Sequence, residues 1–148
     1  LAGFGRERSL KDWKAVGVKF RKEKLSMDES LYSTLLLPQG KKGPAFLAFK
    51  NYEVYLKWND SFIYTVTAAH LAKRLEGAKK YIHKNPSDIL DIESMIKLQN
   101  LLKSIGYDVG KVDGILGAKT RQAVRLVQLE FGLSADSWPT NELLSKLQ

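Results

Sequence analysis

The sequence GYDVGKVDGILGAKT, residues 106–120, is a glycine-rich segment between two stretches whose apolar residues recur at helical spacing. Gly106 occupies the position where a glycine in left-handed conformation ends a helix. Asp113-Gly114 is a turn pair, because glycine tolerates a positive φ and the carboxylate accepts hydrogen bonds from nearby N–H groups. The stretch before the loop predicts a helix with an apolar stripe formed by Ile92, Met95, Ile96, Leu98, Leu102 and Ile105.

Two more helices are predicted after this loop. Gly117 and Thr120 stand at the start of an apolar-periodic run, where small and hydroxyl residues satisfy free backbone N–H groups. The run stops at Gly132-Leu133, and one of its faces carries Ala123, Val124, Val127 and Phe131. Starting signals for a last helix follow at Asp136, Ser137, Pro139 and Thr140. Its inner side would present Leu143, Leu144 and Leu147.

From Leu98 to Val124 the residues follow the order L-Q-x-x-L-x-x-x-G-Y-x-x-G-x-x-D-G-x-x-G-x-x-T-x-x-A-V. This order resembles the small three-helix peptidoglycan-binding domain of bacterial wall hydrolases. Such domains often carry a second, longer D-G loop, whereas Asp136 to Thr140 is short. The resemblance implies contacts with the wall from Tyr107, Asp113, Arg121 and Gln128. An alternative for Asp113 is that it only fixes the turn, and Tyr107 could simply pack under the loop.

Composition indicates a globular protein that holds one ordinary domain or two small ones. The chain has 148 residues, of which 44% are hydrophobic and 27% charged. No apolar run reaches the about 18 residues that a membrane span needs. There is no cysteine, so no disulfide joins its parts, and this neither assigns nor excludes an oxidising compartment. The chain has neither an initiating Met nor a secretory signal, as expected for a mature product.

The positive charge belongs to the first part of the chain. Residues 1–87 hold 17 Lys and Arg against 8 Asp and Glu, whereas residues 88–148 hold 7 against 8. A basic surface suits nucleic acid, anionic lipid or acidic wall polymers. Acids interrupt the basic residues between Arg6 and Lys24, which is more typical of a solvated helical face than of a phosphate-binding surface. We therefore expect no nucleic-acid partner.

The first part of the chain predicts a small β-hairpin and several helices. Two apolar runs, Tyr32 to Leu37 and Ala45 to Phe49, flank a Pro/Gly turn and indicate the hairpin. Arg8 to Val16 predicts an amphipathic helix. Ser61 to Leu75 predicts another, with Asn59 or Ser61 as its cap and an apolar face of Ile63, Val66, Ala69, His70 and Leu71. The spacing of Tyr52, Tyr55 and Trp58 favours a short helix, whereas alternation through Tyr52, Val54 and Leu56 would favour a strand.

These elements give a fold that is mainly α with a small β-hairpin, divided into two domains. Asn85-Pro86 lies in a polar stretch and disfavours a continuing helix. We therefore expect a first domain over residues 1–78, a linker over residues 79–88 and a three-helix domain over residues 89–148. No internal repeat is evident in either domain.

A second resemblance concerns the first domain. Gly43-Pro44-Ala45-Phe46-Leu47 is followed by Trp58-Asn59-x-Ser61-x-x-Tyr64 and by a helix with A-x-x-L-A-x-R-L, and Trp13-x-x-x-Gly17-Val18 precedes them. This order is similar to the C-terminal end of the lytic murein transglycosylase B family, whose catalytic domain is a lysozyme-like α+β fold. A peptidoglycan-binding domain follows the catalytic domain there, as in this sequence. The two resemblances together cover nearly the whole chain.

The resemblance implies an activity and its chemistry. Such enzymes cleave the β-1,4 bond between N-acetylmuramic acid and N-acetylglucosamine without water and leave a 1,6-anhydro ring. One glutamate acts first as acid and then as base, because the nucleophile is the sugar's own hydroxyl, unlike the carboxylate pairs of ordinary glycosidases. That glutamate belongs to an E-S-x-x-G-type helix before the hairpin. Glu29-Ser30 lacks the glycine and leads into a predicted strand, and Glu93-Ser94 lies in the helix that begins at Ile92.

Both glutamates are therefore expected to be surface carboxylates, and we predict that the chain holds no catalytic residue. It would be the C-terminal portion of the enzyme and inactive alone. The alternative is a stand-alone, non-catalytic wall-binding protein. An apolar face of residues 1–76 left open to solvent would favour the enzyme portion, because a truncated domain exposes what its missing half covers.

By the motif match, Trp58, Asn59 and Tyr64 fall on positions that face substrate in the family. Aromatic rings stack on the apolar faces of sugars, and an amide bonds both hydroxyl and N-acetyl groups. The alternative is that Trp58 and Tyr64 belong to the core and that Asn59 only caps a helix. Trp58 stands where tyrosine also occurs, which keeps the stacking surface but loses the hydroxyl.

We expect no cofactor and no metal. Asp108 and Asp113 lack the ligand spacing of a calcium loop, and His70 and His83 lie thirteen residues apart in a chain without cysteine. The expected partner is peptidoglycan, through its glycan strands and stem peptides, in the periplasm or cell envelope. A membrane would be involved only through an upstream lipid anchor, and the protein would be a monomer.

Overall fold

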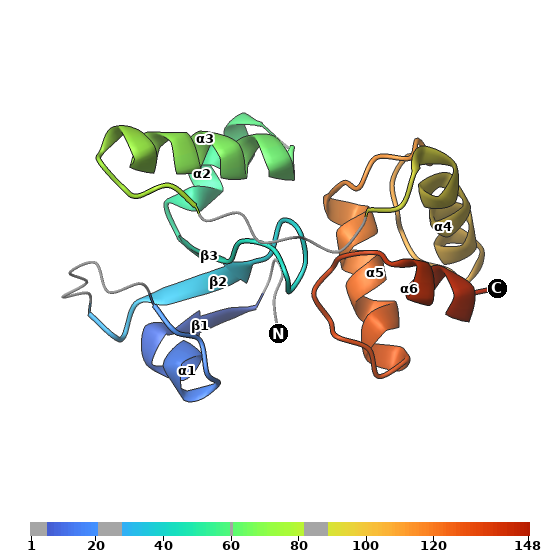
Figure 1. Cartoon of the computed structure of the whole chain (residues 1–148), viewed down its shortest axis with the longest axis horizontal. Helices are drawn as coiled ribbons and strands as arrows, with labels where there is room; N and C mark the ends of the chain where they lie inside the picture. The colour runs from blue at the N-terminus through green and yellow to red at the C-terminus, as the bar shows by residue number, and fades with distance from the viewer. Residues whose placement is uncertain (1–5, 21–27, 60, 82–88) are drawn as a thin grey trace.

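The structure is a computed structural model and describes residues 6–20, 28–59, 61–81 and 89–148. Figure 1 shows two units along the chain: a small sheet with helices α1, α2 and α3, and a cluster of helices α4, α5 and α6. The predicted mainly helical fold with a β-hairpin is confirmed. The expected linker falls largely on residues 82–88, and His83 with it, so both lie outside the described residues.

The sheet of the first unit has three antiparallel strands in the order β1-β2-β3. The predicted hairpin forms from β2 (Tyr32–Leu36) and β3 (Phe46–Phe49), with Leu36 opposite Phe46. β1 (Glu7–Ser9) pairs with the other edge of β2 and was not predicted. The helix expected from Arg8 instead begins at Leu10, because Ser9 caps it by accepting a hydrogen bond from the backbone N–H of Asp12.

Three helices accompany this sheet. In α1 (Leu10–Ala15), Trp13 is fully buried and its indole N–H donates to the carbonyl of Ser33, at 2.9 Å. The stretch with two possible structures forms the helix α2 (Tyr52–Trp58), and α3 (Phe62–Leu75) is capped by Ser61. α2 and α3 are joined by a buried hydrogen bond between the hydroxyls of Tyr52 and Thr65, at 2.7 Å. Burial raises the pKa of Tyr52, so this hydroxyl keeps its proton.

The predicted apolar face of α3 is wrong in part. Ile63 is 48% exposed and Leu71 is 57% exposed, whereas the helix buries Phe62 and Thr65. Helical periodicity identified the helix, and Val66 and Ala69 of the predicted face do pack against the buried cluster. The buried cluster at this contact consists of Leu36, Tyr52 and Phe62.

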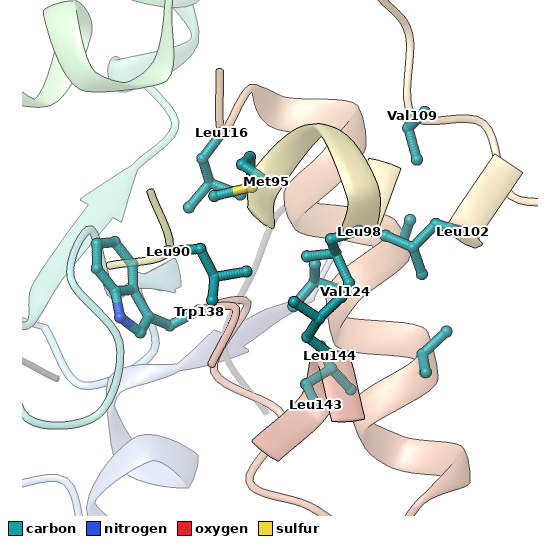
Figure 2. Packing of buried hydrophobic residues seen from close by; sticks show 12 residues of the cluster. Leu90, Met95, Leu98, Leu102, Val109, Leu116, Val124, Trp138, Leu143 and Leu144 are labelled. Atoms are coloured by element: carbon teal, nitrogen blue, oxygen red, sulfur yellow. The ribbon is translucent and has the colours of Figure 1, made fainter. Parts of the chain in front are cut away.

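The second unit is built from α4 (Ile92–Ser104), α5 (Ala118–Glu130) and α6 (Asn141–Lys146). Figure 2 shows their side chains meeting in one core, with Met95, Leu98 and Leu102 from α4 facing Val124 from α5. α6 adds Leu143 and Leu144, as predicted. Two members of the predicted α4 stripe do not belong to this core, because Ile92 is 69% exposed and Ile105 is 54% exposed.

Glycine ends several of these helices in the way the sequence predicted. Gly106 follows α4 with φ +96°, and the N–H of Tyr107 bonds back to the carbonyl of Leu102, at 3.0 Å. Thr140 starts α6 by accepting from the N–H of Leu143. At α5 the prediction differs from the structure: Gly117 provides no side-chain cap, and Thr120 instead donates to the carbonyl of Val109.

Candidate functional site

Two aromatic rings of the first unit stand at its surface beside the α2–α3 turn. Trp58 ends α2 and is 68% exposed, and Tyr64, in the first turn of α3, is 47% exposed. Their ring centroids lie 5.4 Å apart with the planes tilted by 51°. Neither ring belongs to a buried cluster, so the core alternative does not describe them. The pair presents an apolar surface of the kind on which a sugar ring stacks.

Asn59 stands between Trp58 and Tyr64 in the sequence and shapes the turn. Its side-chain oxygen accepts from the N–H of Ser61, at 2.8 Å, and its own backbone N–H closes α2 by bonding to Tyr55. Ser61 then caps α3. The oxygen of Asn59 is therefore used locally, whereas its amide NH₂ has no acceptor among the described residues.

An open pocket lies on the face of the sheet, and neither ring of the aromatic pair lines it. It has a volume of about 460 Å³ and is lined by residues of all three strands and of α2: Glu7, Thr34, Leu36, Ala48, Phe49, Tyr52, Glu53 and Leu56. Part of the sheet and of α2 is thus uncovered by the described chain. Large apolar side chains are exposed elsewhere on the same unit as well: Leu31, Tyr32, Val54, Leu71 and Leu75.

The loop of residues 106–120 in the second unit is organised by one buried side chain, Gln99 of α4. Its amide oxygen accepts from the backbone N–H groups of Asp113 and Gly114, at 3.1 and 2.9 Å. Its amide nitrogen lies within bonding distance of the carbonyl of Ile115, at 3.1 Å. Asp113 in turn accepts from the N–H of Ile115, at 2.9 Å. Asp113 thus fixes the turn and is nevertheless exposed to solvent.

Gln128 of α5 organises the turn before α6 in the same way. Its oxygen accepts from the N–H of Ser137, at 3.0 Å, and its nitrogen donates to the carbonyl of Trp138 and to Asp136, both at 2.9 Å. Asp136 accepts from the N–H of Trp138, at 3.1 Å. Gln128 is 4% exposed, so its amide is used inside the unit and is not presented at the surface.

These two turns are an internal repeat, which the sequence analysis missed. Asp113-Gly114-Ile115 and Asp136-Ser137-Trp138 make matching hydrogen bonds to a glutamine of the preceding helix. The middle residue of each has a positive φ, +77° for Gly114 and +63° for Ser137. The repeat is hidden in the sequence because the second turn replaces glycine with serine and its loop is shorter.

The remaining two candidates of the second unit differ in their surroundings. Tyr107 packs at the edge of the core, and its hydroxyl donates to Glu130; this hydrogen bond raises the pKa of Tyr107 because the protonated hydroxyl is the donor. Arg121 is only 5% exposed and points toward the first unit, where it donates to the carbonyl of Pro38, at 2.9 Å. Arg121 therefore lies between the units.

The two glutamates considered as acids lack the surroundings of a catalytic carboxyl. Glu29 accepts a hydrogen bond from Lys14, and its side chain is 54% exposed. Glu93 lies in the first turn of α4 and is exposed. A general acid needs partial burial to keep its proton near neutral pH. Within the described ranges no group of three or more His, Asp or Glu side chains could hold a metal ion, and no helix is long and apolar enough to cross a membrane.

Comparison with known families identifies both units. Residues 1–73 match the model of the transglycosylase SLT domain, and residues 92–147 match that of a peptidoglycan binding domain. The chain joins a transglycosylase SLT domain to a peptidoglycan-binding domain. We therefore call residues 6–81, where described, the transglycosylase unit and residues 89–148 the peptidoglycan-binding module.

Solved structures and a curated protein support these matches. The chain is similar to SltB3 from Pseudomonas aeruginosa in complex with NAG-anhNAM-pentapeptide, with 38% identity, a TM-score of 0.75 and 99% of the chain covered. A second SltB3 structure, with NAG-NAM-pentapeptide, gives 37% identity, a TM-score of 0.76 and 100% coverage. The chain spans only 40% and 41% of the SltB3 chain in those two structures. A spore cortex-lytic enzyme of Halalkalibacterium halodurans is 38% identical over 56 residues, which are 38% of this chain and 17% of that protein.

Gln99 is the important residue that the candidate set missed. It is fully buried and holds the loop of residues 106–120, which contains Tyr107 and Asp113. A signal was present, because Gln99 stands on the apolar stripe of α4, where a polar side chain needs internal partners. The same reasoning applies to Gln128, which was chosen as a surface contact although it follows the buried Val127.

Proposed function

We propose that this chain is the wall-holding, C-terminal portion of a lytic transglycosylase that cleaves the bond between N-acetylmuramic acid and N-acetylglucosamine. The glutamate that acts as acid and base lies outside this sequence. The chain spans 40% of SltB3, and the two glutamates considered as acids are exposed, both of which support this assignment. On its own the chain holds peptidoglycan and does not cleave it.

The exposed pair of Trp58 and Tyr64 is the observation that carries this proposal. Large aromatic side chains at a surface cost free energy unless they contact something, and these two form a tilted platform with centroids 5.4 Å apart. A glycan strand presents flat apolar sugar faces and N-acetyl groups. We assign stacking on the sugar to Trp58 and Tyr64, and a hydrogen bond to a hydroxyl or N-acetyl group to the amide NH₂ of Asn59.

Among the module's candidates, Tyr107 and Asp113 are the ones we retain for contact with the wall. Asp113 is exposed and Tyr107 is partly exposed, both on the loop of residues 106–120. Asp113 uses its Oδ1 within the turn, and no described donor is recorded for its Oδ2. We assign Arg121 and Gln128 to internal roles, because both are buried.

The alternative of a stand-alone wall-binding protein is less well supported. It requires a transglycosylase unit with a closed core. The open pocket on the sheet, together with exposed residues such as Val54 and Leu75, favours a unit whose surface is covered by further protein. Such an enzyme works on the sacculus, so we propose the cell envelope, and the periplasm where an outer membrane exists, as its location.

Co-sedimentation with purified sacculi tests this function. We expect the chain to pellet with sacculi, Trp58→Ala combined with Tyr64→Ala to reduce the pelleted fraction, and no anhydro-muropeptides to be released. Val54→Ala, which changes an exposed apolar residue of α2 outside the aromatic pair, is the matched control and keeps its binding. A chain that stays in the supernatant, or one that releases anhydro-muropeptides by itself, contradicts the proposal.

A further inference from the structure

A set of contacts joins the turn between β2 and β3 to the peptidoglycan-binding module. The backbone N–H of Lys41 donates to Asp136, at 2.9 Å, and the ammonium group of Lys41 donates to Ser134, at 2.7 Å. Gly40 lies so close to Trp138 that a Cβ on this glycine would be 2.7 Å from the Trp138 Cβ. The turn therefore fits against residues 134–138 in van der Waals contact.

Arg121 completes this contact from α5. Its guanidinium donates to the carbonyl of Pro38, at 2.9 Å, and its carbon Cζ lies 4.7 Å from the ring centroid of Phe62 and 5.7 Å from that of Trp138. It thus touches both units at once, through a hydrogen bond and two cation–π contacts. We name these residues the joint: Pro38, Gly40, Lys41, Phe62, Arg121, Asp136 and Trp138.

The cost of burying Arg121 indicates that this contact is specific. Burial lowers the pKa of Arg121 to about 10, and the nearby Asp136 carboxylate only partly opposes this. Its Nε and Nη1 atoms are buried without a hydrogen-bond partner among the described residues. A flexible pair of domains would leave such a cation in water, because a buried unpaired polar group costs free energy. The contacts with Phe62, Trp138 and Pro38 offset the cost of burying Arg121 only while the two units stay together.

The internal repeat explains why residues 134–138 form the docking surface. In the first turn, Ile115 is 67% exposed, whereas the matching Trp138 in the second turn is 6% exposed, against Gly40. Asp136 holds its own turn through Oδ1 and still accepts from Lys41 through Oδ2. Gln128 fixes Asp136 and the carbonyl of Trp138, so the docking surface is preformed within the module.

We propose that the joint makes the peptidoglycan-binding module a fixed part of the transglycosylase unit, with Arg121 as the residue that positions one against the other. The module then guides a wall strand at a set angle to the sugar-binding surface instead of tethering the enzyme loosely. Phe62, whose ring contacts Arg121, and Tyr64 both belong to the first turn of α3, so one helix end carries a residue of the joint and a residue of the aromatic pair. This guiding role rests on the proposed function, whereas the rigidity of the joint does not.

Pulsed electron spin resonance distances between the units test the joint. The chain contains no cysteine, so Lys57→Cys on α2 and Lys103→Cys on α4, both exposed, give one label on each unit. We expect a single narrow distance distribution. Gly40→Ala inserts a methyl group against Trp138, and Arg121→Ala removes the hydrogen bond and both cation–π contacts. Each should broaden the distribution markedly.

The matched control is Gly17→Ala. Gly17 and Gly40 both have a positive φ, +91° and +68°, so both substitutions strain the backbone, but nothing lies within 4 Å of the Cβ at Gly17. Circular dichroism verifies that each variant stays folded, and Arg121→Ala covers the case in which Gly40→Ala unfolds the hairpin. A broad distribution in the unsubstituted chain, or a narrow one in both joint variants, overturns the proposal. Sacculus co-sedimentation, measured separately, reports on the proposed function, because a loosened joint leaves binding by each unit intact.

Discussion

The two units of this chain differ in how completely each one buries its apolar side chains. The peptidoglycan-binding module has a core cluster of twelve buried residues contributed by three helices and their loops. The sheet, α2 and α3 of the transglycosylase unit share a described cluster of only Leu36, Tyr52 and Phe62, and one of these residues, Phe62, also touches Arg121 of the module. The module is therefore a self-contained fold, whereas the transglycosylase unit depends on its neighbours.

Two buried glutamines help to close the module, whereas the transglycosylase unit has short strands and an open sheet face. In the module, Gln99 and Gln128 supply hydrogen-bond partners for the backbone of two loops, so that about sixty residues close around one core without a disulfide. In the transglycosylase unit, β1 has three residues and β3 has four, and the sheet has an open face. A short twisted sheet of this size needs packing against other elements to be stable.

The largest effect is expected when each unit is expressed without the other. Residues 89–148, expressed alone, should fold cooperatively, because their core is closed within the segment. Residues 1–81 alone should lack a cooperative thermal transition, because they lose Arg121 and Trp138 of the module, which cover Phe62 and the hairpin turn. Circular dichroism melts and proton–nitrogen NMR spectra of the two segments distinguish these outcomes. A sharp transition for residues 1–81 would mean that the transglycosylase unit is complete.

Gln99→Ala should destabilise the module more than the matching substitution Gln128→Ala. It leaves the N–H groups of Asp113 and Gly114 without their acceptor, and an unsatisfied buried group costs about 1–3 kcal/mol. We expect the free energy of unfolding to fall by roughly 2–4 kcal/mol in denaturant titrations. Gln128→Ala orphans one N–H, that of Ser137, and should cost less. Equal losses of unfolding free energy in the two variants would contradict the expected difference between the turns.

The outline of the module could be predicted from the sequence because its signals are local. Gly106 ends α4, Thr140 starts α6, and the spacing of Met95, Leu98 and Leu102 gives the buried face. The wrong predictions have a common cause. Ile92 and Ile105 continue the helical period but lie at the ends of α4, where no partner element covers them, and a pattern within one helix contains no information on what packs against it.

The candidate site was only partly predictable for the same reason. The resemblance to the transglycosylase family selects Trp58, Asn59 and Tyr64 together, and the structure brings the two rings into contact. Arg121 was chosen for a surface role, yet it contacts Pro38, 83 residues earlier in the sequence. Strand β1 was likewise invisible, because three residues carry too little pattern and its partner β2 begins 23 residues after it ends.

An intermediate effect is expected at the aromatic pair. In a full-length enzyme that contains this chain, Trp58→Ala should lower the turnover of purified glycan strands by roughly three- to tenfold, because it removes a stacking surface worth about 0.5–1.5 kcal/mol. Its melting temperature should stay within error of the parent, since the ring is 68% exposed. A loss of stability with unchanged turnover would show that Trp58 packs within the protein and does not bind the sugar.

The smallest effect is expected at the exposed ion pair of the loop. Lys119 and the N–H of Gly110 both hold the Asp108 carboxylate and lower its pKa below the usual 3.8. A lowered pKa means that the stabilisation is present above pH 3.8 and is lost as the pH falls through the lowered value. Asp108→Asn should therefore melt slightly earlier than the parent at pH 7 and match it near pH 2. A difference that persists in acid would show that the charge is not the cause.

The hydrogen bonds of the joint connect residues 83 to 95 positions apart in the sequence, whereas each module helix forms from near neighbours. Closing so long a segment costs chain entropy before any of its contacts is made. We therefore expect the helices of the module to form before the Pro38–Lys41 turn attaches to them. Until the turn attaches, the side of Trp138 that Gly40 covers would be open to solvent.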